Sequence, residues 1–189
     1  GALYFINNID DKDLVARSRR SLIGNSVLFL VFFLSFVIRT LLADGYAVNP
    51  ETGEVFMEPY KYLTNFIEMP LVLVLFLIGV VLVLFGIGKS LLKTKFDKGI
   101  WFTGIGTVLA VLALLLVAGY NNTAYYPSTN DLQSSLTLAN SCSSQFTLRV
   151  MFYVSFLVPF VLAYIFYAWR SIDIHKISEK EMKDGGHAY

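Results

Sequence analysis

Four long runs of apolar residues, separated by polar stretches, dominate the pattern of this chain. They cover residues 21–43, 66–92, 100–119 and 148–169. A helix needs about 20 mostly apolar residues to cross the hydrocarbon core of a membrane. The alternative is a set of buried helices in a soluble protein, but soluble cores do not supply four such runs in 189 residues. The pattern therefore predicts an all-α membrane protein whose four transmembrane helices form one four-helix bundle.

The basic residues are distributed unevenly among the polar segments. Those segments are 1–20, 44–65, 93–99, 120–147 and 170–189. Twelve of the 15 Lys and Arg residues lie in or next to the first, third and fifth segments. Cytoplasmic loops carry an excess of Lys and Arg. We therefore expect both ends of the chain to be cytoplasmic, with the acidic loop 44–65 and the polar loop 120–147 on the outer side.

The composition agrees with a membrane protein and excludes some kinds of site. Hydrophobic residues make up 56% of the chain and charged residues 15%, whereas a soluble domain carries about 25% charged residues. The single cysteine, Cys142, excludes an intrachain disulfide and a zinc or iron–sulfur site built from cysteines. The opening residues GALYFINN read as the last turn of an earlier apolar segment. We therefore expect the chain to be a piece of a longer protein.

Three charged residues at the outer ends of the predicted spans are candidates for chemistry within the membrane. Arg39 lies about one turn from the end of the first span, Glu68 begins the second, and Arg149 begins the fourth. Arg39 can reach the interface or pair with Asp44 or Glu68. We expect a structural belt of ion pairs at this depth, because interfacial charges commonly anchor helices. A proton relay or a contact to substrate is the alternative.

The spans lack an obvious set of ligands for a redox cofactor. Haem iron takes His, Met, Cys or Tyr as axial ligands, and His175 and His187 both lie in the C-terminal tail. Met151 has no histidine at its level. The span glycines fit close helix packing better than nucleotide binding; they are Gly79, Gly86, Gly88, Gly104 and Gly106. Pro159 is expected to kink the fourth span.

The loop before the fourth span is rich in hydroxyl groups and almost free of charge. Its residues 130–149 contain five serines and two threonines but one acid and one base. Hydroxyls and amides can satisfy backbone groups where charges would be costly. We expect the loop to fold back over the bundle, with Ser143, Ser144 and Thr147 available to cap the following helix. A solvated linker is the alternative. The candidates for structural or interface contacts are Ser134, Ser135, Ser144 and Gln145.

This loop and the span after it resemble subunit II of cytochrome bd-type quinol oxidases. The resemblance lies in YYPSTN (125–130), SSLTLANSCSSQFTLRVM (134–151) and VSFLVPFVLAYIFYAWR (154–170). The tail ISEKEMKDGGHAY (177–189) is similar to the ending of that family. The similarity extends over the whole chain and is most specific from 125 to 170. It implies that these residues are about the C-terminal half of a full subunit.

The resemblance implies a function for a complex rather than for this chain alone. The family enzyme oxidises quinol and reduces O2 to water in the bacterial plasma membrane. Subunit I carries the haems b and d, and subunit II is its pseudo-symmetric, haem-free partner, of two four-helix bundles plus a peripheral helix. This chain would bind no cofactor or metal and would supply no catalytic residue. Its partners would be subunit I, the N-terminal half of subunit II, membrane lipid and a small single-span subunit, with no nucleic acid. Arg149 departs from the uncharged polar residue common in the family.

Two other classes of membrane protein compete with this interpretation. A self-contained four-span transporter or channel would want a charged or amide-rich stripe along a span, and none is evident. A four-span adhesion protein would want paired cysteines in its large outer loop, where the chain has Cys142 alone. A non-haem, scaffolding part of the oxidase remains the favoured prediction.

Overall fold

Four long helices dominate the computed structural model, which describes residues 1–92, 96 and 98–172. The elements in chain order are α1 (Ala2–Asn8), α2 (Lys12–Leu42), β1 (Gly45–Val48), β2 (Val55–Glu58), α3 (Lys61–Glu68), α4 (Pro70–Leu92), α5 (Gly99–Gly119), the 3-10 turn η1 (Leu132–Ser134), α6 (Leu138–Ser141), α7 (Gln145–Ser155) and α8 (Val158–Ile172). Four segments are long and apolar enough to cross a membrane: α2, α4, α5 and α7 with α8. The prediction of an all-α membrane protein with four spans is confirmed.

The bounds of the first two spans differ from the apolar runs for local reasons. α2 begins at Lys12 rather than at Ser21, because the Asp11 carboxylate caps it by accepting from the backbone N–H groups of Asp13 and Leu14. The run 66–92 is divided at Met69, which precedes Pro70 and leaves the helical region. Its first three residues therefore belong to α3, and the span itself begins at Pro70.

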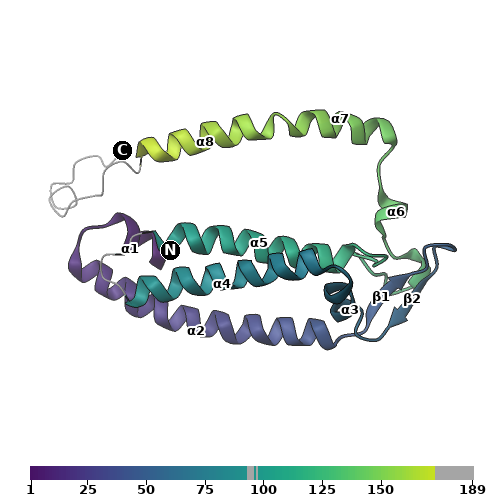
Figure 1. Ribbon diagram of the computed structural model, residues 1–189, viewed down its shortest axis with the longest axis horizontal. Coiled ribbons are helices and arrows are strands. Elements are labelled where there is room, and N and C mark those ends of the chain that lie inside the picture. Colours follow the sequence, from purple (N-terminus) through teal and green to yellow (C-terminus); the bar gives the residue numbers. More distant parts are fainter. Residues whose placement is uncertain (93–95, 97, 173–189) are drawn as a thin grey trace.

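The fourth span extends from Gln145 to Ile172 and is interrupted at its middle. α7 ends at Ser155 and α8 begins at Val158. Pro159 lacks the N–H that would continue the α-helical bonding, and its ring crowds the preceding turn. The expected effect of this proline is thus seen as a break between two helices that follow one another along one direction (Figure 1).

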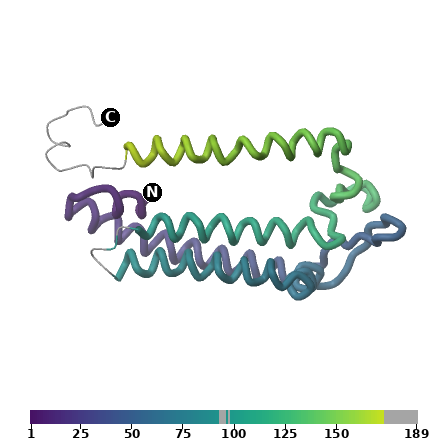
Figure 2. Tube along the Cα trace, turned by 45° about the horizontal axis from the view of Figure 1, so that its top comes forward, coloured from purple at the N-terminus to yellow at the C-terminus, as the bar shows by residue number. Residues whose placement is uncertain are grey.

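The fourth span stands apart from the other three, which corrects the expectation of one four-helix bundle. α2, α4 and α5 lie side by side, whereas α7 and α8 run along them at a distance in both views (Figures 1 and 2). None of the fourth span is buried, against 22% of the most apolar windows of α4 and of α5. The described residues thus form a three-helix bundle with a separate fourth helix. Apolar composition predicts that a helix enters a membrane, but not which helix it packs on.

Glycines allow α4 and α5 to pack with their backbones in contact. A Cβ atom at Gly79 would lie 2.6 Å from the backbone nitrogen of Ala110, and one at Gly106 would lie 2.6 Å from the carbonyl oxygen of Gly79. Gly86 faces the carbonyl oxygen of Gly99 in the same way. In contrast, a Cβ atom at the two other span glycines, Gly88 and Gly104, would meet nothing within 4 Å. The expectation of close packing is therefore confirmed for one glycine of each GIG sequence, and the other glycine faces outward.

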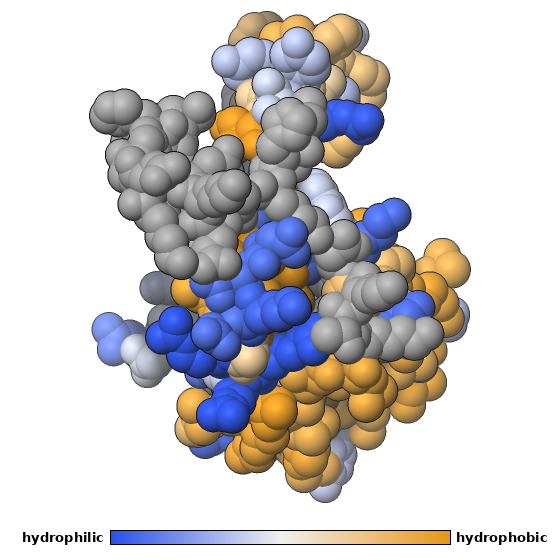
Figure 3. All heavy atoms as spheres, turned by 90° about the vertical axis from the view of Figure 1, so that its left-hand side faces the viewer, coloured by the Kyte–Doolittle hydropathy of each residue, from blue (hydrophilic) through white to orange (hydrophobic). Residues whose placement is uncertain are grey.

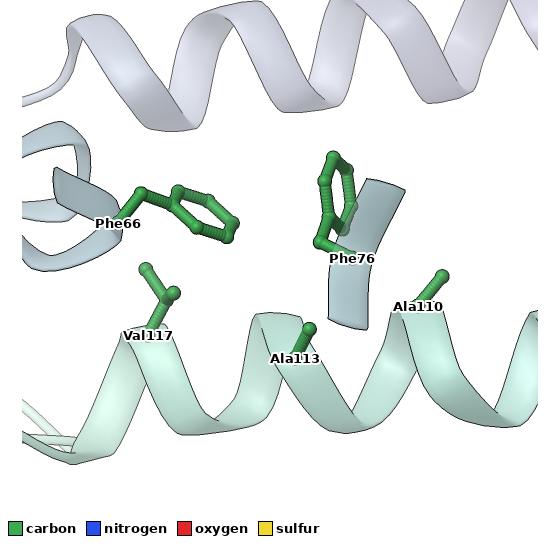
Figure 4. Packing of buried hydrophobic residues seen from close by; sticks show 5 residues of the cluster. All are labelled: Phe66, Phe76, Ala110, Ala113 and Val117. Atoms are coloured by element: carbon green, nitrogen blue, oxygen red, sulfur yellow. The ribbon is translucent and has the colours of Figure 1, made fainter. Parts of the chain in front are cut away.

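The main apolar core lies where α3, α4 and α5 meet. Figure 4 shows Phe66 of α3 and Phe76 of α4 pointing into the space above α5. Their ring centroids are 5.3 Å apart, and Phe76 also stacks near Phe33 of α2 at 6.3 Å. Ala113 and Val117 of α5 close the cluster from below. The aromatic rings thus connect α2 to the tightly packed pair α4 and α5.

One end of the bundle, which we call the capped end, is covered by a small antiparallel hairpin. β1 pairs with β2 from Gly45 opposite Glu58 to Val48 opposite Val55. The chain after α5 adds to the free edge of β1, through backbone hydrogen bonds from Val48 to Asn122 and from Ala124 to Tyr46. The two outer loops of the sequence prediction therefore form one structure.

The opposite end, which we call the basic end, holds the described members of the basic group. They are Lys12, Arg17, Arg19 and Arg20 of α2, Lys89 of α4, Lys98 before α5, and Arg170 in the last turn of α8. Figure 3 looks onto this end, where hydrophilic atoms gather while apolar atoms cover the sides of the helices. The Lys89 ammonium lies over the rings of Phe85 and Phe96, 4.7 and 4.9 Å from their centroids. Such cation–π contacts stabilise a charge close to apolar surroundings.

Candidate functional site

A buried amide cluster joins α3 to the end of α5 at the capped end. Asn65 is fully buried, and its side-chain nitrogen donates to the carbonyl oxygen of Val117 and to the hydroxyl of Thr123, both at 2.8 Å. Its side-chain oxygen accepts from the amide of Asn121 at 3.1 Å. Asn121 in turn donates to the carboxylate of Glu68. All the polar atoms of the Asn65 side chain have hydrogen-bond partners, so this amide joins two helix ends and is not available to bind a ligand.

A second polar pair lies at the start of α3. The Lys61 ammonium is 3.2 Å from the Glu58 carboxylate, and the lysine is 7% exposed. The neighbouring Tyr62 is partly buried, and this burial raises the pKa of its phenol, with a further increase from Tyr46. The phenol is therefore neutral at physiological pH. The ion pair and the phenol are therefore part of the packing of the capped end.

The hydroxyl-rich loop is divided into a packed part and an exposed part. In the packed part the Ser135 side chain is fully buried and accepts from the backbone N–H of Ser128 at 3.0 Å. The side-chain amide of Gln133 exchanges two hydrogen bonds of 2.9 Å with the backbone of Val55. The Gln133 side chain thereby pairs with the edge of β2 as the backbone of a neighbouring strand would. This part of the loop folds onto the capped end, as expected.

The exposed part of the loop leads into the fourth span. Ser144 is the N-cap of α7 and accepts from the backbone N–H of Thr147 at 3.3 Å. Ser144 and the following Gln145 are both exposed in this chain. Ser134 is also exposed and donates to the carboxylate of Asp131 at 3.1 Å. Of the four predicted interface candidates, Ser135 alone is buried within the chain.

The three charged residues predicted to form a belt are not paired with one another. Arg39 is exposed in the last turn of α2, and no ion pair joins it to Asp44 or Glu68 among residues 1–92 and 98–172. Glu68 instead accepts from Asn121. Arg149 lines a shallow depression of about 380 Å³ on the surface of α7, together with Gln145 and Phe152. The structure thus brings Glu68 into the amide cluster and leaves both arginines at the surface.

The fourth span exposes its side chains on all sides. Every residue from Gln145 to Ile172 except Ala168, which is half-buried, is exposed. The exposed aromatic residues are Phe146, Phe152, Tyr153, Phe156, Phe160, Tyr164, Phe166, Tyr167 and Trp169. A helix of this kind needs cover from lipid or from other helices.

Comparison with known proteins identifies the family. A family model described as cytochrome bd terminal oxidase subunit II matches residues 1–172, which include all four spans. The chain belongs to this family. It is similar to cytochrome bd-I ubiquinol oxidase subunit 2 of Escherichia coli strain K12, with 32% identity over 136 residues. The proteins of the same name from E. coli O6:H1 and O157:H7 match to the same extent.

The matched region is 71% of this chain and 34% of each E. coli protein, so it spans about a third of the length of these curated relatives. Membership of the cytochrome bd subunit II family and the four apolar helices make the chain a multi-pass membrane protein. Among the described residues no group of three His, Cys, Asp or Glu is placed to hold a metal ion. His175 and His187 lie outside the described residues.

Sequence reasoning missed the amide cluster of this subunit II chain. Asn65 and Asn121 stand at the ends of two loops and match no motif. Their signal in the sequence is weak: Asn65 is an amide just before an apolar run, and Asn121 and Asn122 form an Asn–Asn pair just after one. Both residues of that pair adopt positive φ, 55° and 52°, a conformation that Asn tolerates better than most residues.

Proposed function

We propose that this chain is the C-terminal part of subunit II of a respiratory cytochrome bd-type quinol:oxygen oxidoreductase. In this role it scaffolds the haem-bearing subunit I, which oxidises quinol and reduces O2 to water. The observation that carries the proposal is the family match over residues 1–172, which extends through every span. Its immediate partners are subunit I, the N-terminal half of subunit II, lipid and a small single-span subunit.

The haems b and d belong to the partner subunit in this proposal. Haem iron takes His, Met, Cys or Tyr, and the described residues of this chain include no histidine. Cys142 is exposed in the loop before the fourth span. We therefore assign no step of the redox reaction to the described residues. Their contribution is to hold the complex together.

The fourth span is the part of the chain that we assign to contacts with partners. Two adjoining observations support this assignment: α7 and α8 bury no residue within the chain, and the exposed Gln145 and Arg149 mark their outer end. Aromatic side chains are enriched in protein interfaces because they bury a large area at a low cost in conformational entropy. We assign Ser134 and Ser144 to the same contact region and Arg39 to anchoring at the membrane interface.

The charge of the basic end supports the orientation that we propose for the chain in the membrane. Lys and Arg are in excess on the cytoplasmic side of membrane proteins. The basic end holds the described Lys and Arg residues of the first turns of α2, whereas the capped end carries the acidic hairpin loop with Glu51 and Glu54. We therefore place the basic end and both chain ends in the cytoplasm of a bacterium and the capped end outside its plasma membrane.

Photo-crosslinking in the intact complex tests the scaffolding role. A photoreactive amino acid is placed in turn at Met151, Phe152, Tyr153 and Val154, which together cover the circumference of α7. The complex is then purified through a tag on subunit II. We expect the purified material to show the Soret absorbance of haem, and the positions of one face to crosslink to a haem-bearing polypeptide or to the N-terminal half of subunit II.

Two results would contradict the proposal. The first is that none of the four positions crosslinks to protein, which would leave the fourth span surrounded by lipid. The second is that the tagged protein purifies without a haem-bearing polypeptide and supports selective solute flux in vesicles, as a transporter or channel would. A position on the hairpin loop, such as Thr52, serves as the matched control because it lies far along the chain from the fourth span and is exposed.

A further inference from the structure

α3 has an inverted pattern of burial for a helix beside an apolar core. It buries Lys61 and Asn65, which are 7% and 0% exposed, together with Phe66. It exposes the apolar residues Leu63 and Ile67, at 39% and 68%. Helices at a water-exposed surface show the opposite arrangement, with polar residues outward. The outer face of α3 is therefore built for apolar surroundings.

The exposed apolar residues form one stripe along the helix. Leu63 and Ile67 are four residues apart, which places them on one side of α3. The exposed Tyr60 is the N-cap residue that directly precedes the helix. The polar side chains on the other side have partners within the protein. Lys61 pairs with Glu58, and Asn65 makes the hydrogen bonds of the amide cluster. Because these polar side chains have partners within the protein, α3 does not need water around it, and its apolar face can lie in lipid.

The length of α4 places α3 at the boundary of the hydrocarbon core. α4 has 23 residues from Pro70 to Leu92, and at 1.5 Å per residue it is about 34 Å long. The hydrocarbon core is about 30 Å thick, so α4 crosses it without help from α3. The break at Met69 turns the chain, and α3 contacts α2, α4, α5 and β1 together across the end of the bundle (Figure 1).

We propose that α3 is an interfacial helix that inserts Tyr60, Leu63 and Ile67 into the boundary between lipid headgroups and acyl chains. The occupant of this face is the phospholipid bilayer, because the stripe is continuous with exposed apolar residues at the start of the membrane-spanning α4, Leu71 and Val74. Tyrosine is enriched at this boundary, where its ring is apolar and its hydroxyl is hydrated. The inference goes beyond the scaffolding role and does not depend on it.

Spin-label accessibility measures the depth of α3 in the intact complex in phospholipid vesicles. The exposed Cys142 is first replaced in the variant Cys142→Ser, so that a nitroxide can be attached at Leu63→Cys or Ile67→Cys. Thr52→Cys in the hairpin turn is the aqueous control, and Leu77→Cys, about two turns into α4, is the hydrocarbon control. Collisions are recorded with O2, which concentrates in lipid, and with a water-soluble nickel chelate.

We expect the ratio of O2 to nickel collisions at positions 63 and 67 to be several-fold higher than at Thr52→Cys and lower than at Leu77→Cys. Position 67, which adjoins α4, should be at least as deep as position 63. A ratio equal to that of Thr52→Cys would overturn the proposal, since α3 would then lie in water. Low accessibility to both reagents would overturn it as well, because the stripe would be covered by another polypeptide. An unchanged far-ultraviolet circular dichroism spectrum of each variant shows that the protein is folded.

Discussion

The packing of α4 against α5 makes Gly106→Ala the most informative single substitution. A Cβ atom at position 106 would lie 2.6 Å from the carbonyl oxygen of Gly79 and 2.8 Å from the backbone nitrogen of Val83. Backbone atoms of a packed helix cannot rotate away as the end of a side chain can. The matched control is Gly104→Ala on the same helix, where the added methyl group meets nothing within 4 Å.

The size of the effect follows from the distance that the helices must move. Ordinary van der Waals contact of a Cβ atom begins at 3.4 Å, so α4 and α5 have to separate locally by ~0.8 Å. Such overpacking costs ~1–3 kcal/mol. Replacing a helical glycine by alanine recovers up to ~1 kcal/mol through helix propensity. We therefore expect Gly106→Ala to lower the free energy of unfolding by about 1–2 kcal/mol and Gly104→Ala to leave it unchanged or raise it slightly.

Thermal unfolding of the purified complex in detergent, followed by circular dichroism, compares the two variants with the parent. We expect a lower midpoint for Gly106→Ala but not for Gly104→Ala. A second pair, Gly86→Ala and Gly88→Ala on α4, should repeat the contrast, because position 86 faces the Gly99 carbonyl and position 88 is open. Equal midpoints for the two members of each pair would refute the claim that backbone contact holds α4 to α5.

Three further predictions concern the capped end. Asn65→Ala should lower the free energy of unfolding by ~1–3 kcal/mol, because it leaves the buried carbonyl of Val117 without a donor; the exposed Asn130→Ala should have little effect in the same thermal assay. Tyr62 has a raised phenol pKa in the folded state, so its contribution to stability is present below its ordinary pKa of 10.0 and is lost as the pH rises through the folded value. The fall in stability above pH 10 should therefore be smaller in Tyr62→Phe, and an identical pH profile would contradict the assignment. Finally, a membrane-impermeant thiol reagent should label Cys142 in intact spheroplasts, whereas labelling after permeabilisation alone would place the capped end in the cytoplasm.

The number and approximate position of the spans could be predicted from the sequence because membrane insertion depends on local composition. A run of about 20 apolar residues crosses the hydrocarbon core whatever it packs on. The third run, 100–119, matches α5 (Gly99–Gly119) within one residue. The first and second runs match the observed helices less well. Asp11 caps α2 ahead of the first run, and Pro70 separates α3 from α4 within the second. Both differences are effects of single residues at helix ends.

The sequence around each glycine did not predict which glycines would lie in the contact between α4 and α5. Gly86 and Gly88 flank Ile87, and Gly104 and Gly106 flank Ile105, yet one glycine of each pair contacts a backbone and the other is open. The rotation of each helix about its axis decides this outcome, and that rotation depends on the partner helix. The sequence indicated that glycines were available for close packing, and the assembled pair α4 and α5 selected which of them are used.

By itself the sequence determined the all-α, four-span class, the segregation of basic residues to one end and the resemblance to cytochrome bd subunit II. Each of these depends on residue types along a continuous stretch. Only the tertiary structure decided that Lys61 and Asn65 are buried while Leu63 and Ile67 are exposed. It also decided that two loops form one cap, and that the fourth span stands apart from the other three. These features depend on contacts between residues as far apart as Asn65 and Val117, which hydropathy along the chain does not encode.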